Sequence, residues 1–153
     1  MLRIMQFVFF LLISSALAFI DLYSKTFFQI LLREENIVIW KDFLLTLKYN
    51  DGIAFSLPVK GYIQIALSFG LLAGLIIYAH RHWKWKHWLP SIGTAFIVGG
   101  ALGNIYERVL NSTVTDFIQV FSWFPIFNFA DTFIFIGVCL LIIFEWNINK
   151  NKS

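Results

Sequence analysis

The chain of 153 residues is 59% hydrophobic and only 14% charged, and its formal net charge is +3. A soluble domain of this length has too much surface to carry so few charges, so the composition predicts a membrane protein with a single domain, residues 1–153. The basic residues lie at the ends of apolar segments rather than along one face, which argues against a nucleic-acid-binding protein. The only cysteine, Cys139, lies inside an apolar segment, where we expect it to be buried rather than to act as a nucleophile.

Four apolar segments are long enough to cross the hydrocarbon core, which needs roughly 17–25 residues per helix. Backbone polar groups in lipid must be paired within the segment, so each is expected to be a helix. The sequence therefore predicts an all-α membrane protein with transmembrane spans at residues 4–20, 61–79, 88–105 and 126–146. The first span, with Arg3 before it and Ala16-Leu17-Ala18 at its end, imitates a cleavable signal peptide, but it is long for one, and we expect it to be retained.

The segment between the first two spans has its own folding pattern. Residues 36–50 are rich in β-branched and aromatic side chains and end at the turn signal Asn50-Asp51-Gly52. We expect a strand or a short hairpin at the membrane surface, anchored at the interface by Trp40, Tyr49 and Tyr62.

Positive charge density predicts the orientation. Arg81, Lys84 and Lys86 are concentrated in one short segment, whereas the basic residues of the other side are spread out and interleaved with acids. We therefore expect both termini and residues 80–87 to be cytoplasmic, and residues 21–60 and 106–125 to face outward. The histidines of residues 80–87 imitate a metal cluster, but the adjacent basic residues would repel a cation, so we expect no metal site there and no cofactor.

Polar residues from five segments gather at the outward side. Charged groups in or near apolar spans are costly and are therefore candidates for a functional site. Asp21 and Lys25 are spaced as an i,i+4 ion pair, which we expect to be structural. Two G-x-x-x-G pairs, Gly99 with Gly103 and Gly70 with Gly74, are expected to let helices approach closely. The remaining polar candidates are Asn50, Gly52, Asn104, Arg108, Asp116, Asn128 and Asp131.

Five motifs containing these residues resemble those of one family. Asp21–Lys25 is similar to D-x-x-[ST]-K, Asn50–Phe55 to N-x-G-x-[AS]-F, and Gly99–Arg108 to G-G-x-x-G-N-x-x-D-R. Val114–Phe117 is similar to V-x-D-F, and Phe127–Asp131 to F-N-x-A-D. Each motif is weak alone, but five in the same order on four spans resemble lipoprotein signal peptidase along nearly the whole chain.

The resemblance implies an aspartic endopeptidase of the bacterial cytoplasmic membrane. Its substrate would be a prolipoprotein that carries diacylglycerol on a cysteine and is cut just before that cysteine. Asp116 and Asp131 stand at the positions of the two catalytic aspartates. Glu107 and Ser112 depart from the family's usual Asp and Gly, but neither is part of the pair. The chemistry of these residues and their places in the motifs predict substrate binding or support of the pair by Asn50, Gly52, Asn104, Arg108, Asn128 and Ala130, and structural roles for Asp21, Lys25, Gly99 and Gly103. Nothing in the sequence requires a cofactor or a partner chain, so we expect a monomer in contact with membrane lipid.

Two other functions stay open on the residues alone. Intramembrane acids also occur in proton-coupled carriers, although here the polar groups lie at one membrane face and no inverted repeat is visible. A non-catalytic membrane subunit would use the same groups only to hold its helices together.

Overall fold

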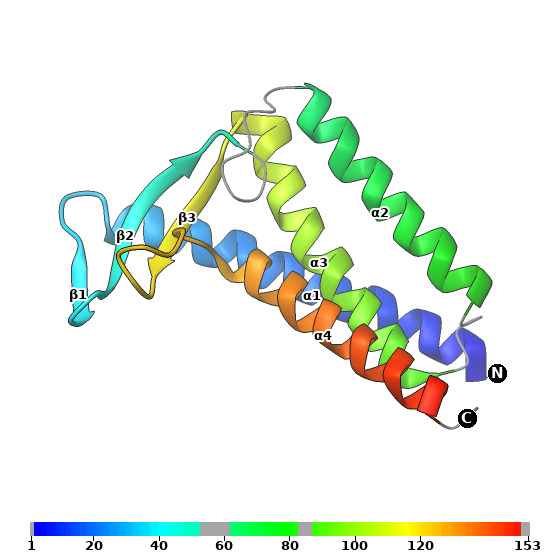
Figure 1. Cartoon of the computed structure of the whole chain (residues 1–153). Coiled ribbons are helices and arrows are strands. Elements are labelled where there is room, and N and C mark those ends of the chain that lie inside the picture. Colours follow the sequence, from blue (N-terminus) through cyan, green and yellow to red (C-terminus); the bar gives the residue numbers. More distant parts are fainter. Residues whose placement is uncertain (1, 53–61, 83–86, 151–153) are drawn as a thin grey trace.

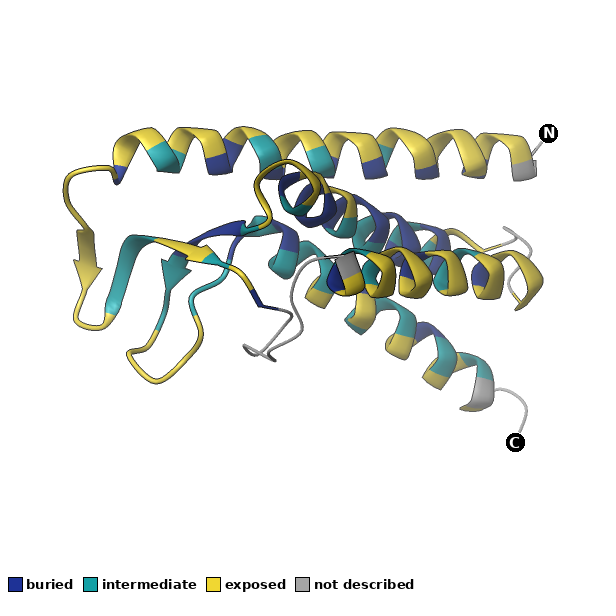
Figure 2. Cartoon of the chain, turned by 90° about the horizontal axis from the view of Figure 1, so that it is seen from above, coloured by how far each residue is buried: buried dark blue, intermediate teal, exposed yellow. Residues whose placement is uncertain are grey.

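Four long helices dominate the computed structural model, which describes residues 2–52, 62–82 and 87–150. They are α1 (Leu2–Leu31), α2 (Tyr62–His82), α3 (Trp88–Asn111) and α4 (Phe129–Lys150), and each contains a stretch apolar and long enough to span a membrane. Helix α3 packs against each of the other three and is the most buried of them (Figures 1 and 2). The exposed apolar faces of the others are those expected to contact lipid.

Two helix ends differ from the predicted spans. Helix α1 continues to Leu31 instead of ending near residue 20, and it contains neither Gly nor Pro. The predicted span ended at residue 20, and Asp21 and Lys25, expected as an i,i+4 pair beyond it, lie within the helix, paired and buried. Helix α4 begins at Phe129 rather than near residue 126.

A small antiparallel sheet lies at one end of the helices (Figure 1). Its strands are β1 (Ile37–Trp40), β2 (Phe43–Asn50) and β3 (Val114–Gln119), in the order β1-β2-β3. The expected hairpin in residues 36–50 is thus confirmed, whereas β3 was not predicted. The register pairs Lys48 with Asp116 and Asn50 with Val114, which joins the segment before α2 to the segment after α3.

Two glycines of α3 allow it to lie close to α1. A Cβ atom at Gly99 would lie 2.8 Å from the Ser14 carbonyl oxygen of α1, and one at Gly103 would lie 3.0 Å from Asp21 Cγ. The close approach expected from Gly70 and Gly74 was wrong, because no described atom lies within 4 Å of a Cβ built at either position.

Some expectations concern residues outside the described ranges. They involve Lys60 and Gly61, the basic Lys84 and Lys86, and the last two residues of the turn motif, Ala54 and Phe55. The side chain of the proposed anchor Tyr62 is likewise outside the description. Cys139 is described and is partly rather than fully buried.

Candidate active site

Asp116 and Asp131 come from different elements and meet at one side chain. Asp116 lies on β3 and Asp131 in the first turn of α4. Asn128 joins them: its Nδ2 donates to Asp116 Oδ1 at 2.6 Å, and its backbone N–H donates to Asp131 Oδ2 with an N···O distance of 3.3 Å. Asn128 and Asp116 are 0% and 2% exposed, whereas Asp131 is partly exposed. The two carboxylates are therefore held beside one buried amide.

Asn128 is also the residue before the first turn of α4. Its Oδ1 accepts a hydrogen bond from the Asp131 backbone N–H at 3.0 Å, while Asp131 Oδ2 accepts one from the Asn128 backbone N–H. This reciprocal pair is a capping box, which satisfies backbone donors that the start of a helix leaves free. It explains why α4 begins at Phe129. It also places the Asp131 carboxylate at the positive end of the helix, where a negative charge is favoured.

Each carboxylate has a second asparagine donor. Asn50 Nδ2 donates to Asp116 Oδ2 at 3.0 Å, and Asn104 Nδ2 donates to Asp131 Oδ1 at 2.9 Å. Burial raises the pKa of Asp116 to about 6, and the nearby charge of Asp131 raises it as well, against the opposing hydrogen bonds from Asn50 and Asn128. Asp116 therefore holds a proton more readily than an isolated carboxyl does.

A buried ammonium group lies behind the pair. Lys25 is 1% exposed, and its Nζ lies 2.7 Å from Asp21 Oδ2, 3.2 Å from Glu107 Oε2 and 2.7 Å from Asn104 Oδ1. Because the Asn104 oxygen faces this cation, the Asn104 amide nitrogen is directed at Asp131. Lys25 therefore fixes the orientation of a side chain that contacts Asp131.

Asp21 connects the same cluster to the start of α4. Its Oδ1 accepts a hydrogen bond of 2.8 Å from the backbone N–H of Ala130, which is one of the donors left free at a helix start. Ala130 is fully buried, and a Cβ at Gly100 would collide with its carbonyl oxygen. A larger side chain at residue 130 would therefore have little room between α1 and α3.

Four further polar residues join the site without having been predicted as part of it. Glu107 accepts hydrogen bonds from the Thr115 backbone N–H at 2.9 Å and from the Thr115 hydroxyl at 2.7 Å, next to Asp116. Gln29 donates to Thr115 Oγ1 at 2.6 Å, and Gln64 of α2 donates to the Gly52 carbonyl oxygen at 2.6 Å. Gln29 and Gln64 lie in or beside apolar segments, and that position was a signal that could have identified them.

Arg108 supplies a positive charge on the other side of the pair. Its guanidinium interacts electrostatically with both Asp131 and Asp116, and Nη2 donates to the Gly52 carbonyl oxygen at 3.3 Å. The Gly52 N–H donates in turn to Asn50 Oδ1 at 3.0 Å. Arg108 Nε is buried and has no hydrogen-bond partner among the described residues, so one donor of the guanidinium remains available.

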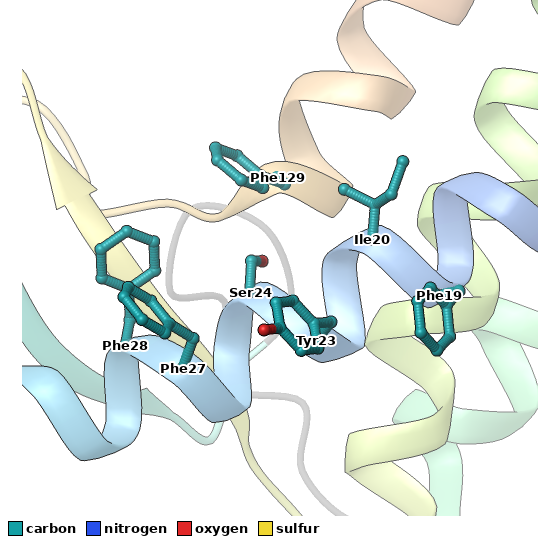
Figure 3. A pocket seen from close by; sticks show the side chains of 7 residues that line it. All are labelled: Phe19, Ile20, Tyr23, Ser24, Phe27, Phe28 and Phe129. Carbon is teal, nitrogen blue, oxygen red and sulfur yellow. The ribbon is translucent and has the colours of Figure 1, made fainter.

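A groove lined mostly by apolar side chains lies between α1 and the start of α4 (Figure 3). Side chains alternate along a strand, so Phe117 points away from the side of Asp116, and its ring stacks on Phe28 with centroids 4.3 Å apart. Phe129 packs edge-on against Phe117 at 5.4 Å. The groove has a volume of about 330 Å³ and is lined by Phe19, Ile20, Tyr23, Ser24, Phe27, Phe28 and Phe129.

The structure thus brings together all the residues that the sequence placed at the site. No group of three His, Cys, Asp or Glu side chains in the described ranges is arranged to hold a metal ion. The groups around the pair are the Arg108 guanidinium and several amides, and the Lys25 ammonium with the carboxylates of Asp21 and Glu107 lies behind them.

Comparison with known proteins gives a consistent result. A family model described as signal peptidase (SPase) II matches residues 13–147. The lipoprotein signal peptidase of Dichelobacter nodosus is 38% identical over 143 residues, covering 89% of this chain and 92% of its own. That of Pseudomonas aeruginosa is 34% identical over 143 residues, covering 86% and 84%. A solved bacterial membrane enzyme superposes with a TM-score of 0.81 at 25% identity, covering 94% of this chain and 91% of its own.

Proposed function

The chain belongs to the family of lipoprotein signal peptidases, multi-pass bacterial membrane enzymes that cleave signal peptides from prolipoproteins, and we propose that Asp116 and Asp131 form its catalytic pair. Asn128 supports this proposal because it donates to Asp116 and, through its backbone, to Asp131. Two buried or half-buried acids held this way suit a reaction in which one proton is shared.

The proposed mechanism is direct attack of water on the scissile peptide carbonyl. The ionised carboxylate removes a proton from the water, while the protonated carboxyl donates a hydrogen bond to the carbonyl oxygen and then supplies the proton to the departing amine. Burial raises the pKa of Asp116 to about 6, which favours protonation of one member of the pair relative to an ordinary carboxyl. The two acids titrate as a pair.

The remaining polar groups bind substrate or hold the pair in place. Arg108 is the cation nearest the developing oxyanion in this proposal, and its available Nε–H donor suits that role. Asn50 and Gly52 bind the substrate backbone next to Asp116. Asn104, Asn128 and Ala130 position Asp131. Asp21 and Lys25 act from behind, and Gly99 and Gly103 let α3 approach α1.

The substrate is a prolipoprotein with diacylglyceryl-cysteine, cut just before that cysteine. Both termini lie on the cytoplasmic side and the pair lies at the outer face of the membrane, so the lipid of the substrate holds the scissile bond at the depth of the pair. An impermeant thiol reagent tests this orientation at Trp85→Cys in a Cys139→Ala background. Residue 85 lies outside the described ranges, and efficient labelling in intact cells would reverse the orientation.

The deciding experiment follows release of the signal peptide from a diacylglyceryl-modified precursor by purified enzyme in detergent. Asp116→Asn and Asp131→Asn should each insert stably and release nothing, since Asn keeps the shape but cannot exchange a proton. The double variant should be hardly worse than either single one, because the two acids act as a unit. Asp42→Asn, at an exposed acid in the β1–β2 turn, is the matched control and should retain full activity.

The products distinguish this function from its alternatives. Mass spectrometry of the mature product should find diacylglyceryl-cysteine at its amino terminus, and the same precursor without lipid should remain uncut. Substantial turnover by either single Asp variant would reject the two-aspartate mechanism while leaving the family assignment intact. A proton-coupled carrier would release no peptide at all, and membership of a peptidase family already argues against that function.

A further inference from the structure

The segment that joins the two aspartates has a surface that the peptidase chemistry does not use. Between β3 and α4 the chain forms a loop, residues 120–126, which we call the aromatic loop. Phe121, Trp123 and Phe124 in it are 47%, 77% and 42% exposed. From Phe117 to Ala130 the sequence contains no charged residue. An exposed aromatic surface of this kind is unusual on a part of a protein that contacts only water.

The aromatic loop is ordered rather than extended. Its base is closed by hydrogen bonds between Ile118 and Phe127, with N···O distances of 2.9 and 3.0 Å, and its tip by the bond from Phe124 N–H to the Phe121 carbonyl oxygen at 3.1 Å. The rings of Phe121 and Trp123 stack with centroids 5.4 Å apart, and Phe124 packs edge-on against Trp123 at 5.9 Å. The three rings therefore form a continuous preformed surface rather than separate side chains.

The aromatic loop lies close to a membrane-spanning stretch, which makes lipid the expected contact for its exposed rings. Phe127, at the base of the loop, is two residues before Phe129, the first residue of a membrane-spanning stretch, so it lies within about 7 Å of that stretch. The other turns on this side are charged, with Arg33 and Glu34 in one and Lys41 and Asp42 in another. Trp in particular is favoured where hydrocarbon meets lipid headgroups.

We propose that the aromatic loop is a membrane-contact surface, which inserts Phe121, Trp123 and Phe124 into the boundary between headgroups and acyl chains of the leaflet nearest Asp116 and Asp131. The occupant is bilayer lipid and not the acyl chains of a substrate. Because Phe117 and Phe127 at the base adjoin Asp116 and Asn128, the depth of the loop in the bilayer sets the height of the two carboxylates relative to the membrane.

Site-directed spin labelling tests this without any measurement of activity. The full-length protein, with Cys139→Ala, is labelled at Trp123→Cys and placed in vesicles of phosphatidylethanolamine and phosphatidylglycerol without substrate. Power saturation compares collision of the nitroxide with oxygen, which partitions into lipid, and with a water-soluble nickel complex. The references are Phe135→Cys on the exposed face of α4, where the native side chain is 70% exposed, and Glu34→Cys, where it is 88% exposed in a charged turn.

The nitroxide at residue 123 should show an oxygen preference close to that of residue 135 and far from that of residue 34. Ser122→Cys, at the same exposed tip, gives the same readout if the variant at residue 123 does not keep the wild-type thermal transition. A nickel accessibility like that of residue 34 would overturn the proposal. Protection of the nitroxide from nickel only when lipidated precursor is added would also overturn it, because the loop would then be a substrate site. Dipolar broadening between labelled copies would overturn it as well, because the loop would then be an interface between protein molecules. The result does not depend on the roles proposed for Asp116 and Asp131.

Discussion

The substitution Lys25→Met removes the charge at the centre of the buried network while keeping much of the side-chain volume. In the native protein the ammonium contacts Asp21, Glu107 and Asn104 at 2.7, 3.2 and 2.7 Å, and it is only 1% exposed. The variant would leave two buried carboxylates facing each other with no cation between them. The Asn104 oxygen would also lose the charge that orients its amide toward Asp131.

The expected loss follows from the burial of all three partners. Removing one member of a buried ion pair costs about 3–5 kcal/mol, because the charge left behind is neither hydrated nor paired. This corresponds to a change of roughly 10²- to 10⁴-fold in the ratio of folded to unfolded protein, since ~1.4 kcal/mol is a factor of ten. Exposed ion pairs contribute far less, so the effect should depend on burial and not on charge alone.

Unfolding in mixed micelles, followed by the loss of helical signal, measures this difference. The matched control is Arg33→Met, which breaks the pair between Arg33 Nε and Glu34 Oε1 at 3.8 Å, where the side chains are 81% and 88% exposed, and it should change nothing measurable. Adding Glu107→Gln to Lys25→Met should recover part of the lost stability by removing one of the orphaned charges. If Lys25→Met were as stable and as active as Arg33→Met, the buried network would have neither the structural nor the positioning role assigned to it.

Three further outcomes are expected. Burial raises the pKa of Asp116 from 3.8 to about 6, so between these pH values the folded protein binds more protons than the unfolded chain. The folded state should therefore lose up to ~3 kcal/mol of stability as pH rises through 6, which thermal unfolding of the wild type measures. An equally steep fall in Asp116→Asn would exclude Asp116 as its source. Gly103→Ala should destabilise the protein by about 1–3 kcal/mol, because the new Cβ would lie 3.0 Å from Asp21 Cγ, while Gly70→Ala, with no described atom within 4 Å, should be neutral in the same micelle assay. Ser112 adopts φ 60°, so Ser112→Gly should stabilise α3's end by about 1 kcal/mol with cleavage unchanged, and a loss of stability would mean that the serine hydroxyl has a role of its own.

The left-handed conformation at Ser112 gives a physical reason why glycine suits this position. The family usually has Gly at this position, and Ser112 ends α3 with its N–H bonded to the Arg108 carbonyl oxygen at 3.0 Å. Glycine adopts this conformation without the steric clash that a Cβ introduces. The backbone shows that the serine places a Cβ in a left-handed conformation at the end of α3.

The sequence alone predicted the spans and the polar cluster because both depend on local patterns. Apolar length predicts helices in lipid, and the cost of intramembrane charge makes Asp131 and Arg108 stand out. Helix α1 extends past the predicted span because Asp21 and Lys25 pair within it, as their i,i+4 spacing predicts. The further contacts of Lys25 with Glu107 and Asn104 depend on the packing of α1 against α3 and are not contained in one segment.

The geometry of the site depends on contacts between distant segments and could not be predicted in the same way. Strand β3 is only six residues long, and its register with β2 includes a bulge between Leu45 and Lys48, so the pairing that brings Asn50 to Asp116 has no signature in either strand alone. Glu107 was noticed only as a departure from a motif. Its contacts with Lys25 and Thr115 appear only once α1, α3 and β3 are packed together.

The dispersal of the site along the chain has a consequence for its biosynthesis. Asp131 belongs to the last helix, the amide that orients it belongs to α3, and the cation that orients the amide belongs to α1. The chain is synthesised from its amino terminus, so α4, which carries Asp131, is the last of the described helices to enter the membrane. The two carboxylates therefore come together only once α4 has been inserted, and if they are the catalytic pair, as proposed, hydrolysis requires that last helix.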